Sequence, residues 1–224
     1  MPRVITALII ADFRKRLCDI ASQLLAEQGM DGFNMRELAK RLRVSPMTAY
    51  RYFSDKDEIL AHLRARGFAR LADLLEEAQA LPTTPQDATA ALVRVYVRFA
   101  LEEQVNYRLM FDMFQPGSHD LPELALHRRR VRTVMTDHAA LLVHRAVIAG
   151  EPEIIGQFLW SALHGVVALH LAAKLDEAAV ERVVAETMRV FANARPGIPL
   201  NQQTGWAARG PSPDSGLTAL SAVE

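Results

Sequence analysis

The stretch MRELAKRLRVSPMTAYRYF, residues 35–53, decides how we interpret the fold of the whole chain. Its first half carries one apolar face at helical spacing, which comprises Leu38, Ala39 and Leu42. Ser45 and Pro46 then predict a helix start, because a Ser side chain can accept free backbone N–H groups and Pro loses no hydrogen bond at the first helical position. The stretch therefore predicts two short helices joined by a tight turn.

The second of these helices has an unusual outward face. Ala49 and Phe53 lie four residues apart and are expected to pack inward. The side chains expected to point largely outward are Met47, Thr48, Tyr50, Arg51 and Tyr52. Aromatic rings gain nothing from water, whereas the second helix of a helix-turn-helix lies in the DNA major groove, where hydroxyls and Arg reach phosphates and base edges. The pattern therefore favours DNA binding.

A longer segment, GFNMRELAKRLRVSPMTAYRYFSDKDEIL at 32–60, resembles the DNA-binding domain of the TetR family of bacterial transcriptional regulators. The resemblance includes the Gly-Phe pair before the first helix, the Tyr-Arg-Tyr-Phe run and the Ser-Asp-Lys-Asp-Glu start of the next helix. The family usually has Gly at the turn position that Arg43 occupies here. If that position requires a positive φ, a non-Gly residue is strained by about 1 kcal/mol.

The resemblance implies a set of DNA-contacting residues. In the family, the Lys that matches Lys56 sits with a helix N-terminus against a DNA phosphate, although a solvated surface Lys is the alternative here. Arg51 is expected to add phosphate affinity in the same way as Lys56. The candidate DNA-binding residues are Arg36, Ser45, Pro46, Met47, Thr48, Tyr50, Arg51, Tyr52 and Lys56.

Charge and cysteine content agree with this interpretation. The 224-residue chain has no net charge, but residues 36–56 contain six basic and two acidic side chains, a local net charge of +4. A patch, and not the whole surface, is therefore expected to face DNA phosphates. Cys18 is the only cysteine, so no intrachain disulfide can form and a reducing cytoplasm fits.

The N-terminal region predicts a helix that supports the helix-turn-helix. The apolar residues 4–11 have only Arg3 before them, a charged run at 12–16 after them and no cleavage site of a signal peptide, so we expect them to lead into this helix. This helix should end near Gly29, and Gly29 should adopt a left-handed backbone conformation there. Further along, Ser54 is expected to cap a long helix that reaches about Ala80.

The remainder predicts an all-α chain with three parts. Residues 1–55 are expected to form the DNA-binding domain, 56–195 a helical ligand-binding and dimerisation domain, and 196–224 a disordered or loosely attached tail. Thr84 and Asp176 are expected to cap helices, and Asn106 to begin a short one. Leu121 and Pro122 should open a long helix that reaches about residue 149.

Residues 154–175 form the most apolar stretch and are long enough to span a bilayer. Gln157, Ser161, His164 and His170 fall within it and argue against membrane insertion. A helix that is apolar nearly all round is instead one buried on several sides. We expect this helix and the next one to pair with their copies in a second chain, which gives a homodimer through a four-helix bundle.

The C-terminal half carries a second, shorter resemblance. The segment WSALHG at 160–165 is similar to the Trp-x-x-x-His-Gly signature of one subgroup of TetR-type C-terminal domains, and residues 106–111 fit its earlier short helix. The family's C-terminal domain binds a small molecule, which implies an apolar pocket here. The candidate lining residues are Phe99, Tyr107, Met110, Phe111, Phe114, Trp160 and His164. Simple core packing is the alternative for each of them.

Other functions remain open at this point. The arginines at 128–132 fit a solvated face better than a second DNA surface. His138, His144, His164 and His170 with Asp137 could hold a metal in a helical enzyme, and loss of the turn Gly could mean a ligand-binding regulator that no longer binds DNA. We expect no cofactor and no catalytic residues, and favour a cytoplasmic, dimeric repressor that a small ligand releases from an operator in double-stranded DNA.

Overall fold

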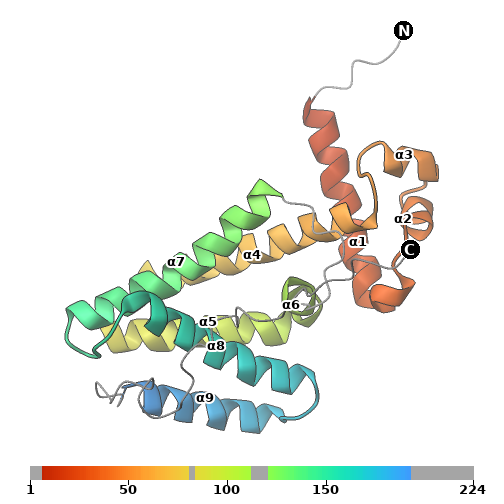
Figure 1. Cartoon of the computed structure of the whole chain (residues 1–224). Helices are drawn as coiled ribbons and strands as arrows, with labels where there is room; N and C mark the ends of the chain where they lie inside the picture. The colour runs from red at the N-terminus through yellow and green to blue at the C-terminus, as the bar shows by residue number, and fades with distance from the viewer. Residues whose placement is uncertain (1–6, 81–83, 112–120, 193–224) are drawn as a thin grey trace, which may run out of the picture.

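The computed structural model describes residues 7–80, 84–111 and 121–192, and every regular element in these ranges is an α-helix (Figure 1). The all-α prediction is therefore confirmed for the described part of the chain. The elements are α1 (Ala7–Gly32), α2 (Met35–Arg41), α3 (Pro46–Tyr50), α4 (Lys56–Ala80), α5 (Pro85–Glu102), α6 (Gln104–Phe111), α7 (Pro122–His144), α8 (Pro152–Leu171) and α9 (Glu177–Ala192). The predicted tail 196–224, residues 4–6 of the apolar run 4–11 and Phe114 lie outside the described residues, and the rest of that run belongs to α1.

Helices α1, α2 and α3 gather at one end of the molecule and form the N-terminal head with the start of α4 (Figure 1). The head has its own hydrophobic core, which includes Leu17, Leu24, Phe33, Leu38, Ala49 and Phe53. Gly29 has φ 68° as predicted, but the chain resumes helical geometry until Gly32. The Arg14 guanidinium lies 4.3 Å above the Phe53 ring and donates to Glu58 Oε1 at 2.8 Å, which ties α1 to α4.

Side-chain caps fix where the two short helices begin. The Thr48 backbone N–H donates to Ser45 Oγ at 3.2 Å, so Ser45 caps α3 and Pro46 occupies its first turn, as predicted. Asn34 caps α2 in the same way, because its Oδ1 accepts from the backbone N–H groups of Arg36 and Glu37. The cap at Asn34 was not identified from the sequence.

The turn between α2 and α3 places Arg43 in the left-handed region at φ 55°. This conformation lets the Val44 backbone N–H donate to the Ala39 carbonyl at 3.0 Å and closes α2 with a tight turn. Arg43 therefore adopts the backbone geometry that the usual Gly would provide, at a cost of about 1 kcal/mol.

The start of α4 differs from the prediction. The Glu58 backbone N–H donates to Asp55 Oδ1 at 2.8 Å, so Asp55 and not Ser54 caps the helix. Ser54 instead donates from its backbone N–H and from its hydroxyl to the Glu58 carboxylate, at 2.7 and 3.0 Å. These hydrogen bonds help to hold the pKa of Glu58 below its ordinary value, against the opposing effect of burial.

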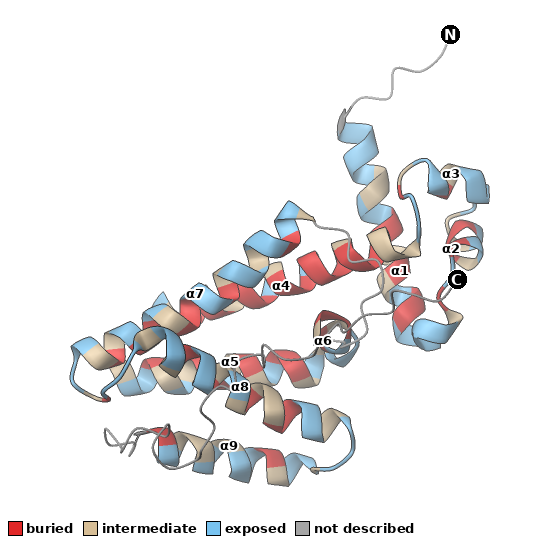
Figure 2. Ribbon diagram, viewed as in Figure 1, coloured by how far each residue is buried: buried red, intermediate tan, exposed pale blue. Residues whose placement is uncertain are grey.

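Helix α4 belongs to two hydrophobic cores. Its first turns contribute Ile59, Leu60 and Leu63 to the head, and its later turns contribute Phe68, Leu71 and Leu75 to the larger C-terminal core. Figure 2 shows this buried face continuing along the helix, and Figure 1 shows α7 beside it. The head core therefore extends beyond residue 55, where the predicted first domain ends.

The C-terminal helices begin close to the predicted positions. Thr84 Oγ1 accepts from the Asp87 backbone N–H at 3.1 Å, and Asp176 Oδ1 accepts from that of Ala179 at 2.6 Å, which confirms both caps. Helix α6 begins at Gln104 and not at Asn106, whose side chain donates to the Glu103 carboxylate at 3.0 Å. Helix α7 ends at His144, five residues earlier than expected.

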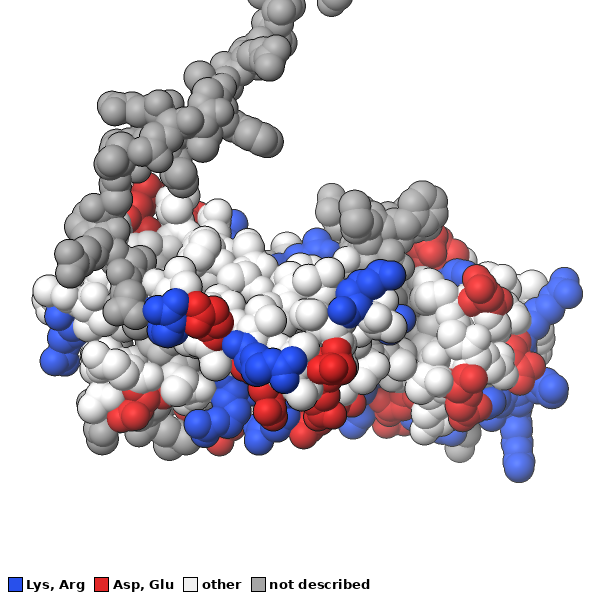
Figure 3. Space-filling view, turned by 90° about the horizontal axis from the view of Figure 1, so that it is seen from below, with Lys and Arg blue, Asp and Glu red and all other residues white. Residues whose placement is uncertain are grey.

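Helices α8 and α9 are only partly covered by the rest of the chain. Ile154 and Phe158 of α8 are 57% and 53% exposed, and Val190 of α9 is 51% exposed. By length and composition α8 alone among the described helices could cross a membrane, yet its other face packs on α5, α7 and α9. Figure 3, which views the molecule from the side where α9 lies, shows a wide uncharged area between scattered charges.

The left-handed turn gives a stability test. We expect Arg43→Gly to increase the free energy of unfolding by about 1 kcal/mol, because Gly adopts positive φ without steric cost. Arg16 is also exposed but lies within α1, so Arg16→Gly should decrease that free energy by about 1 kcal/mol. Urea denaturation of both variants measures the change, and equal destabilisation by both would contradict the assigned strain.

Candidate DNA-binding face and ligand cavity

The outward face of α3 is exposed, as its sequence predicts. Met47 and Tyr50 are 72% and 48% exposed, and Arg51 at the end of the helix is exposed as well. On its inner side, the helix buries Ala49 completely, and Phe53 just after the helix is buried as well. Buried residues at i and i+4 thus fix which side of α3 is presented to the outside.

Tyr52 lies differently from the prediction that it points largely outward. It is half-buried, and its ring centroid lies 4.3 Å from that of Phe13 on α1. The chain has left α3 at this point, which carries the Tyr52 ring back over α1. Contact between Tyr52 and DNA stays a prediction, as do the contacts of the other candidate residues.

The remaining polar candidates belong to α3, to its N-cap or to the helices before and after it in the sequence. Ser45 Oγ and Thr48 Oγ1 lie 2.9 Å apart, so the cap also orients the Thr48 hydroxyl. Arg36 is exposed in the first turn of α2. Lys56 is the first residue of α4, where backbone N–H groups at a helix N-terminus favour an anion such as phosphate.

The positive charge of residues 36–56 is distributed unevenly. Arg41 forms a bidentate ion pair with Glu27 of α1, and this pair lowers the pKa of Glu27. Lys40 lies 3.7 Å from Glu37. Within the described residues no ion pair holds Arg36, Arg43, Arg51 or Lys56, so four of the six basic side chains in this segment remain available.

The predicted ligand-lining residues lie in different places, and three of the described ones line the same cavity. Met110, Phe111 and Trp160 line a cavity of about 510 Å³ together with Phe68 of α4. Phe99 is buried in the hydrophobic core and does not line this cavity, so core packing describes it better.

Tyr107 and His164 take part in a buried chain of hydrogen bonds behind the cavity. Trp160 Nε1–H donates to the Tyr96 hydroxyl at 3.1 Å, the hydroxyls of Tyr96 and Tyr107 are 2.8 Å apart, and Tyr107 lies 2.7 Å from His164 Nδ1. Indole N–H can only donate, so every proton finds a partner if Tyr96 donates to Tyr107 and Tyr107 to His164 Nδ1. The neutral form of His164 completes this chain.

Burial shifts the pKa values of the hydrogen-bonded side chains in the expected directions. It raises the pKa of Tyr96 to about 12, and it raises that of Tyr107 as well. Burial lowers the pKa of His164, which favours the neutral imidazole that accepts from Tyr107. All three groups are therefore held uncharged at neutral pH.

Sequence reasoning missed Tyr96 and the arginines that line this cavity. Tyr96 is a buried residue of α5, and only the crossing of α5, α6 and α8 reveals the partners of its hydroxyl. Arg128, Arg129 and Arg132 of α7 are exposed, in agreement with the predicted solvated face, but they also line the cavity. The signal in the sequence was their spacing along one helix.

The histidines considered for a metal site have separate partners. His138 is fully buried and lies 2.8 Å from Thr89 Oγ1, and burial lowers its pKa to about 4. His164 contacts Tyr107, and His170 Nδ1 lies 3.0 Å from the Leu175 carbonyl. Within residues 7–80, 84–111 and 121–192, no three His, Cys, Asp or Glu side chains are grouped as metal ligands.

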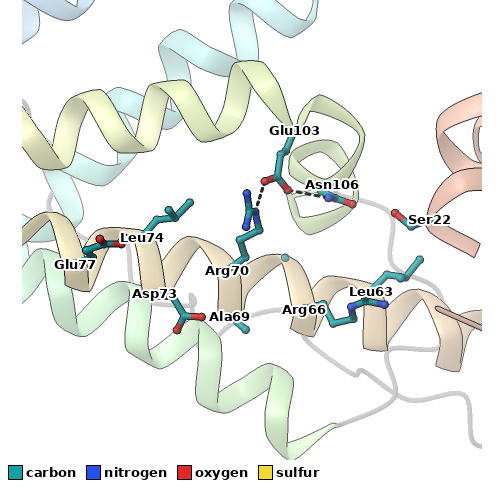
Figure 4. A pocket seen from close by; sticks show the side chains of 11 residues that line it. Ser22, Leu63, Arg66, Ala69, Arg70, Asp73, Leu74, Glu77, Glu103 and Asn106 are labelled. Atoms are coloured by element: carbon teal, nitrogen blue, oxygen red, sulfur yellow. Dashed lines mark hydrogen bonds and ion pairs between the residues drawn. The ribbon is translucent and has the colours of Figure 1, made fainter. Parts of the chain in front are cut away.

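A second cavity, of about 400 Å³, lies between α1, α4 and the α5–α6 junction (Figure 4). Figure 4 shows Arg70 pointing from α4 toward Glu103, with which it forms an ion pair, while Asn106 donates to the same carboxylate. Asp73 and Glu77 add further negative charge to this lining. Its charged groups therefore balance one another within the protein.

Comparisons with known proteins match both halves of the chain. A family model described as bacterial regulatory proteins, tetR family, matches residues 17–63. A second one, described as tetracyclin repressor-like, C-terminal domain, matches residues 89–191. The proposed Trp-x-x-x-His-Gly subgroup stays a prediction.

Individual relatives agree with these family matches. The HTH-type transcriptional regulator BetI of Rhizobium meliloti (strain 1021) is 29% identical over 123 residues, which span 54% of this chain and 61% of that protein. A structure of a protein with unknown function from Rhodococcus sp. RHA1 is 26% identical with a TM-score of 0.70, covering 86% of this chain and 97% of that one.

A third comparison supports the fold alone. The structure of the TetR family transcriptional regulator PfmR from Thermus thermophilus is 19% identical, with a TM-score of 0.62. The match covers 79% of this chain and 97% of that one.

The hydrogen bonds that link Trp160, Tyr96, Tyr107 and His164 give a stability test. We expect Tyr107→Phe to lower the free energy of unfolding by about 1–3 kcal/mol, because Tyr96 and His164 Nδ1 each lose a buried partner. Tyr50→Phe removes an exposed hydroxyl and should change it by less than about 0.5 kcal/mol. Thermal denaturation compares the two variants. Equal effects on the free energy of unfolding would contradict a stabilising role of these buried hydrogen bonds.

Proposed function

Because this chain belongs to the TetR family of bacterial transcriptional regulators, we propose that it is a DNA-binding repressor released by a small ligand. The observation that carries the proposal is the exposed face of α3, where Met47, Tyr50 and Arg51 stand above a buried anchor. A short capped helix of this kind can enter a major groove and bring hydroxyl, aromatic and guanidinium groups to base edges and phosphates. The cytoplasm is the proposed location.

We infer that Lys56 and the N-terminus of α4 bind a DNA phosphate. Lys56 is half-buried at the first position of α4, and the backbone N–H groups of that turn support an anion. Arg36 and Arg51 flank the same face from α2 and from the end of α3. In this division of roles, Lys56 supplies affinity without sequence preference, and Arg36 reads base edges.

We infer that the protein is a homodimer through α8 and α9. Exposed apolar residues follow one face of α8 at Ile154, Phe158 and Leu169, and α9 adds Val183 and Val190. A side-chain carbon added at Gly165 would meet no atom within 4 Å, so this position leaves room for a helix of a second chain. A four-helix bundle of two copies would cover these residues and set the distance between two heads.

The position of the aromatic cavity supports the proposal that a ligand releases the protein from DNA. Phe68 lies on α4, the helix that also builds the head core, so a ligand in the cavity contacts the helix that carries the head. A ligand that reverses a two-state equilibrium from 1:99 to 99:1 must prefer the released state by about 5.5 kcal/mol. Two heads at the wrong spacing cannot reach adjacent major grooves.

The structure favours neither alternative function. Arg43 adopts the left-handed turn conformation, so the absence of Gly does not remove the helix-turn-helix geometry. The candidate metal ligands have separate protein partners, as described above for His138, His164 and His170. TetR family members are generally not enzymes, and we propose no catalytic activity.

The proposed roles on DNA can be separated by substitution. We expect Lys56→Ala to weaken binding to all DNA sequences about equally and to lower the slope of log affinity against log salt by about 1 for each phosphate contact removed. Arg36→Ala should instead relax the preference at particular base pairs. Binding titrations at several salt concentrations, on DNA selected by the protein from a random pool, distinguish them, and equal loss of sequence preference would contradict the assignment.

The proposed dimer face can be tested by its mass in solution. We expect light scattering at micromolar concentration to give twice the 24.9 kDa of one chain, and Phe158→Glu to shift the protein toward the monomer. Leu126 of α7 is similarly exposed but lies outside the proposed face, so Leu126→Glu should leave the dimer intact. A wild-type mass near one chain would rule the dimer out.

A further inference from the structure

The cavity beside α4 has an apolar interior and a basic edge. The apolar part of its lining consists of the buried Phe68 and Met110, the half-buried Phe111 and Trp160, and the exposed Ala125. Three arginines of α7 complete the lining, namely Arg128, Arg129 and Arg132, and none of the lining residues that the structure describes is acidic. All three are exposed, so they lie at the border between the cavity and solvent.

The other cavities that contain several arginines differ in charge. The cavity of Figure 4 holds Arg66 and Arg70 but also three carboxylates. The groove between α5 and α9 holds Arg94 and Arg98 but again has three carboxylates, from Glu102, Glu177 and Glu181. Among the described cavities with several arginines, the one beside α4 therefore differs in having no carboxylate among its described lining residues.

Ion pairs along α7 account for only part of its arginine run. Arg130 turns toward α4, where it donates to Glu76 and Asp73 at distances of 2.6–2.9 Å. Arg129 and Arg132 form no ion pair or hydrogen bond with another described residue. Arg128 lies 5.4 Å from the centre of the Phe68 ring, so its charge is also placed at the cavity.

We propose that this cavity binds an amphipathic organic anion, with an apolar body against Phe111 and Trp160 and a carboxylate, sulfonate or phosphate head against Arg129 and Arg132. Guanidinium groups bind such heads through paired, charge-assisted hydrogen bonds. The head stays at the solvent border, so its desolvation cost is smaller than in a closed interior. The volume of about 510 Å³ lies within the usual range for small-molecule sites.

The position of this cavity connects the proposed anion to the release of DNA, and to that extent the inference rests on the proposed function. The Phe111 ring lies 4.7 Å from that of Tyr107 and 4.6 Å from that of His164. Trp160 both lines the cavity and donates to Tyr96. A ligand body in the cavity therefore contacts the two aromatic residues that border the buried hydrogen-bond chain, and Phe68 on the helix of the head.

Direct binding measurements on the full chain test the ligand class. The probes are 1-anilinonaphthalene-8-sulfonate and decanoate, with decanol as the neutral counterpart and decyltrimethylammonium as the cationic one. We expect 1-anilinonaphthalene-8-sulfonate to bind and to quench the fluorescence of Trp160 by energy transfer in a Trp206→Phe background. Decanoate should displace this probe, and the neutral and cationic chains should bind at least about tenfold more weakly than decanoate. Equal affinity for decanoate and decanol, or binding of neither anion, would overturn the proposal.

A pair of double variants assigns the anion to this site. Arg129→Gln with Arg132→Gln should weaken decanoate binding about tenfold or more, because the head loses both guanidinium groups. Arg94→Gln with Arg98→Gln removes the same charge from the groove between α5 and α9 and should change it less than about twofold. Equal weakening by both double variants would overturn the assignment.

DNA binding measured without ligand separates this inference from the proposed function. The Arg129 and Arg132 double variant should retain wild-type DNA affinity, and a loss there would mean that these arginines bind DNA phosphates and would overturn the anion site. Wild-type protein that binds DNA but no anionic probe contradicts only the ligand class. Wild-type protein that binds the anions but no DNA contradicts the repressor function and leaves the anion site in place.

Discussion

The continuous apolar face of α4 is the constraint on which the rest of the structure depends. Ile59, Leu60 and Leu63 bury it in the head, and Phe68, Leu71 and Leu75 bury it against the C-terminal helices. A 25-residue helix fixed at both ends moves largely as one body, so the head cannot tilt without disturbing the contacts of α4 with α7. This shared burial joins the two hydrophobic cores through one helix, and we propose that a ligand beside Phe68 acts on α3 through it.

Polar side chains have partners in the aromatic cluster of the C-terminal domain, whereas several cations on the exposed face of the head have no ion pair within the described residues. In the C-terminal domain the hydroxyls of Tyr96 and Tyr107 satisfy each other, Trp160 and His164, so the buried aromatic cluster is neutral and closed. On the head, Arg36 and Arg51 extend into solvent without an ion pair among the described residues, and the same holds for Arg129 and Arg132 at the cavity. Cations without a protein partner therefore remain at the two places where we propose anionic partners, the phosphates of DNA and the head of the ligand.

Local patterns in the sequence predicted most of the fold, and contacts between distant segments supplied what it lacked. Ser45, Thr84 and Asp176 were recognised as caps because capping depends on a residue and the three that follow it. Ser54 was predicted as the cap of α4, but Asp can cap as well as Ser, and the hydrogen bond from the Glu58 backbone N–H to Asp55 Oδ1 makes Asp55 the cap. Tyr52 and Tyr96 were misjudged or missed because their surroundings come from α1 in one case and from α6 and α8 in the other. The cavity arginines were missed for the same reason, since helical spacing shows a shared face but not what lies opposite.

The central claim is that two copies of the chain present α3 to the same side of a duplex, at a spacing set by α4 and the dimer. Hydroxyl-radical footprinting of the intact protein, on DNA that it selects from a random pool, tests this claim most directly. The account predicts two protected segments on one face of the duplex, with centres about one helical turn of 10–10.5 base pairs or a whole multiple apart. A single protected segment, or two segments on opposite faces of the duplex, would contradict it.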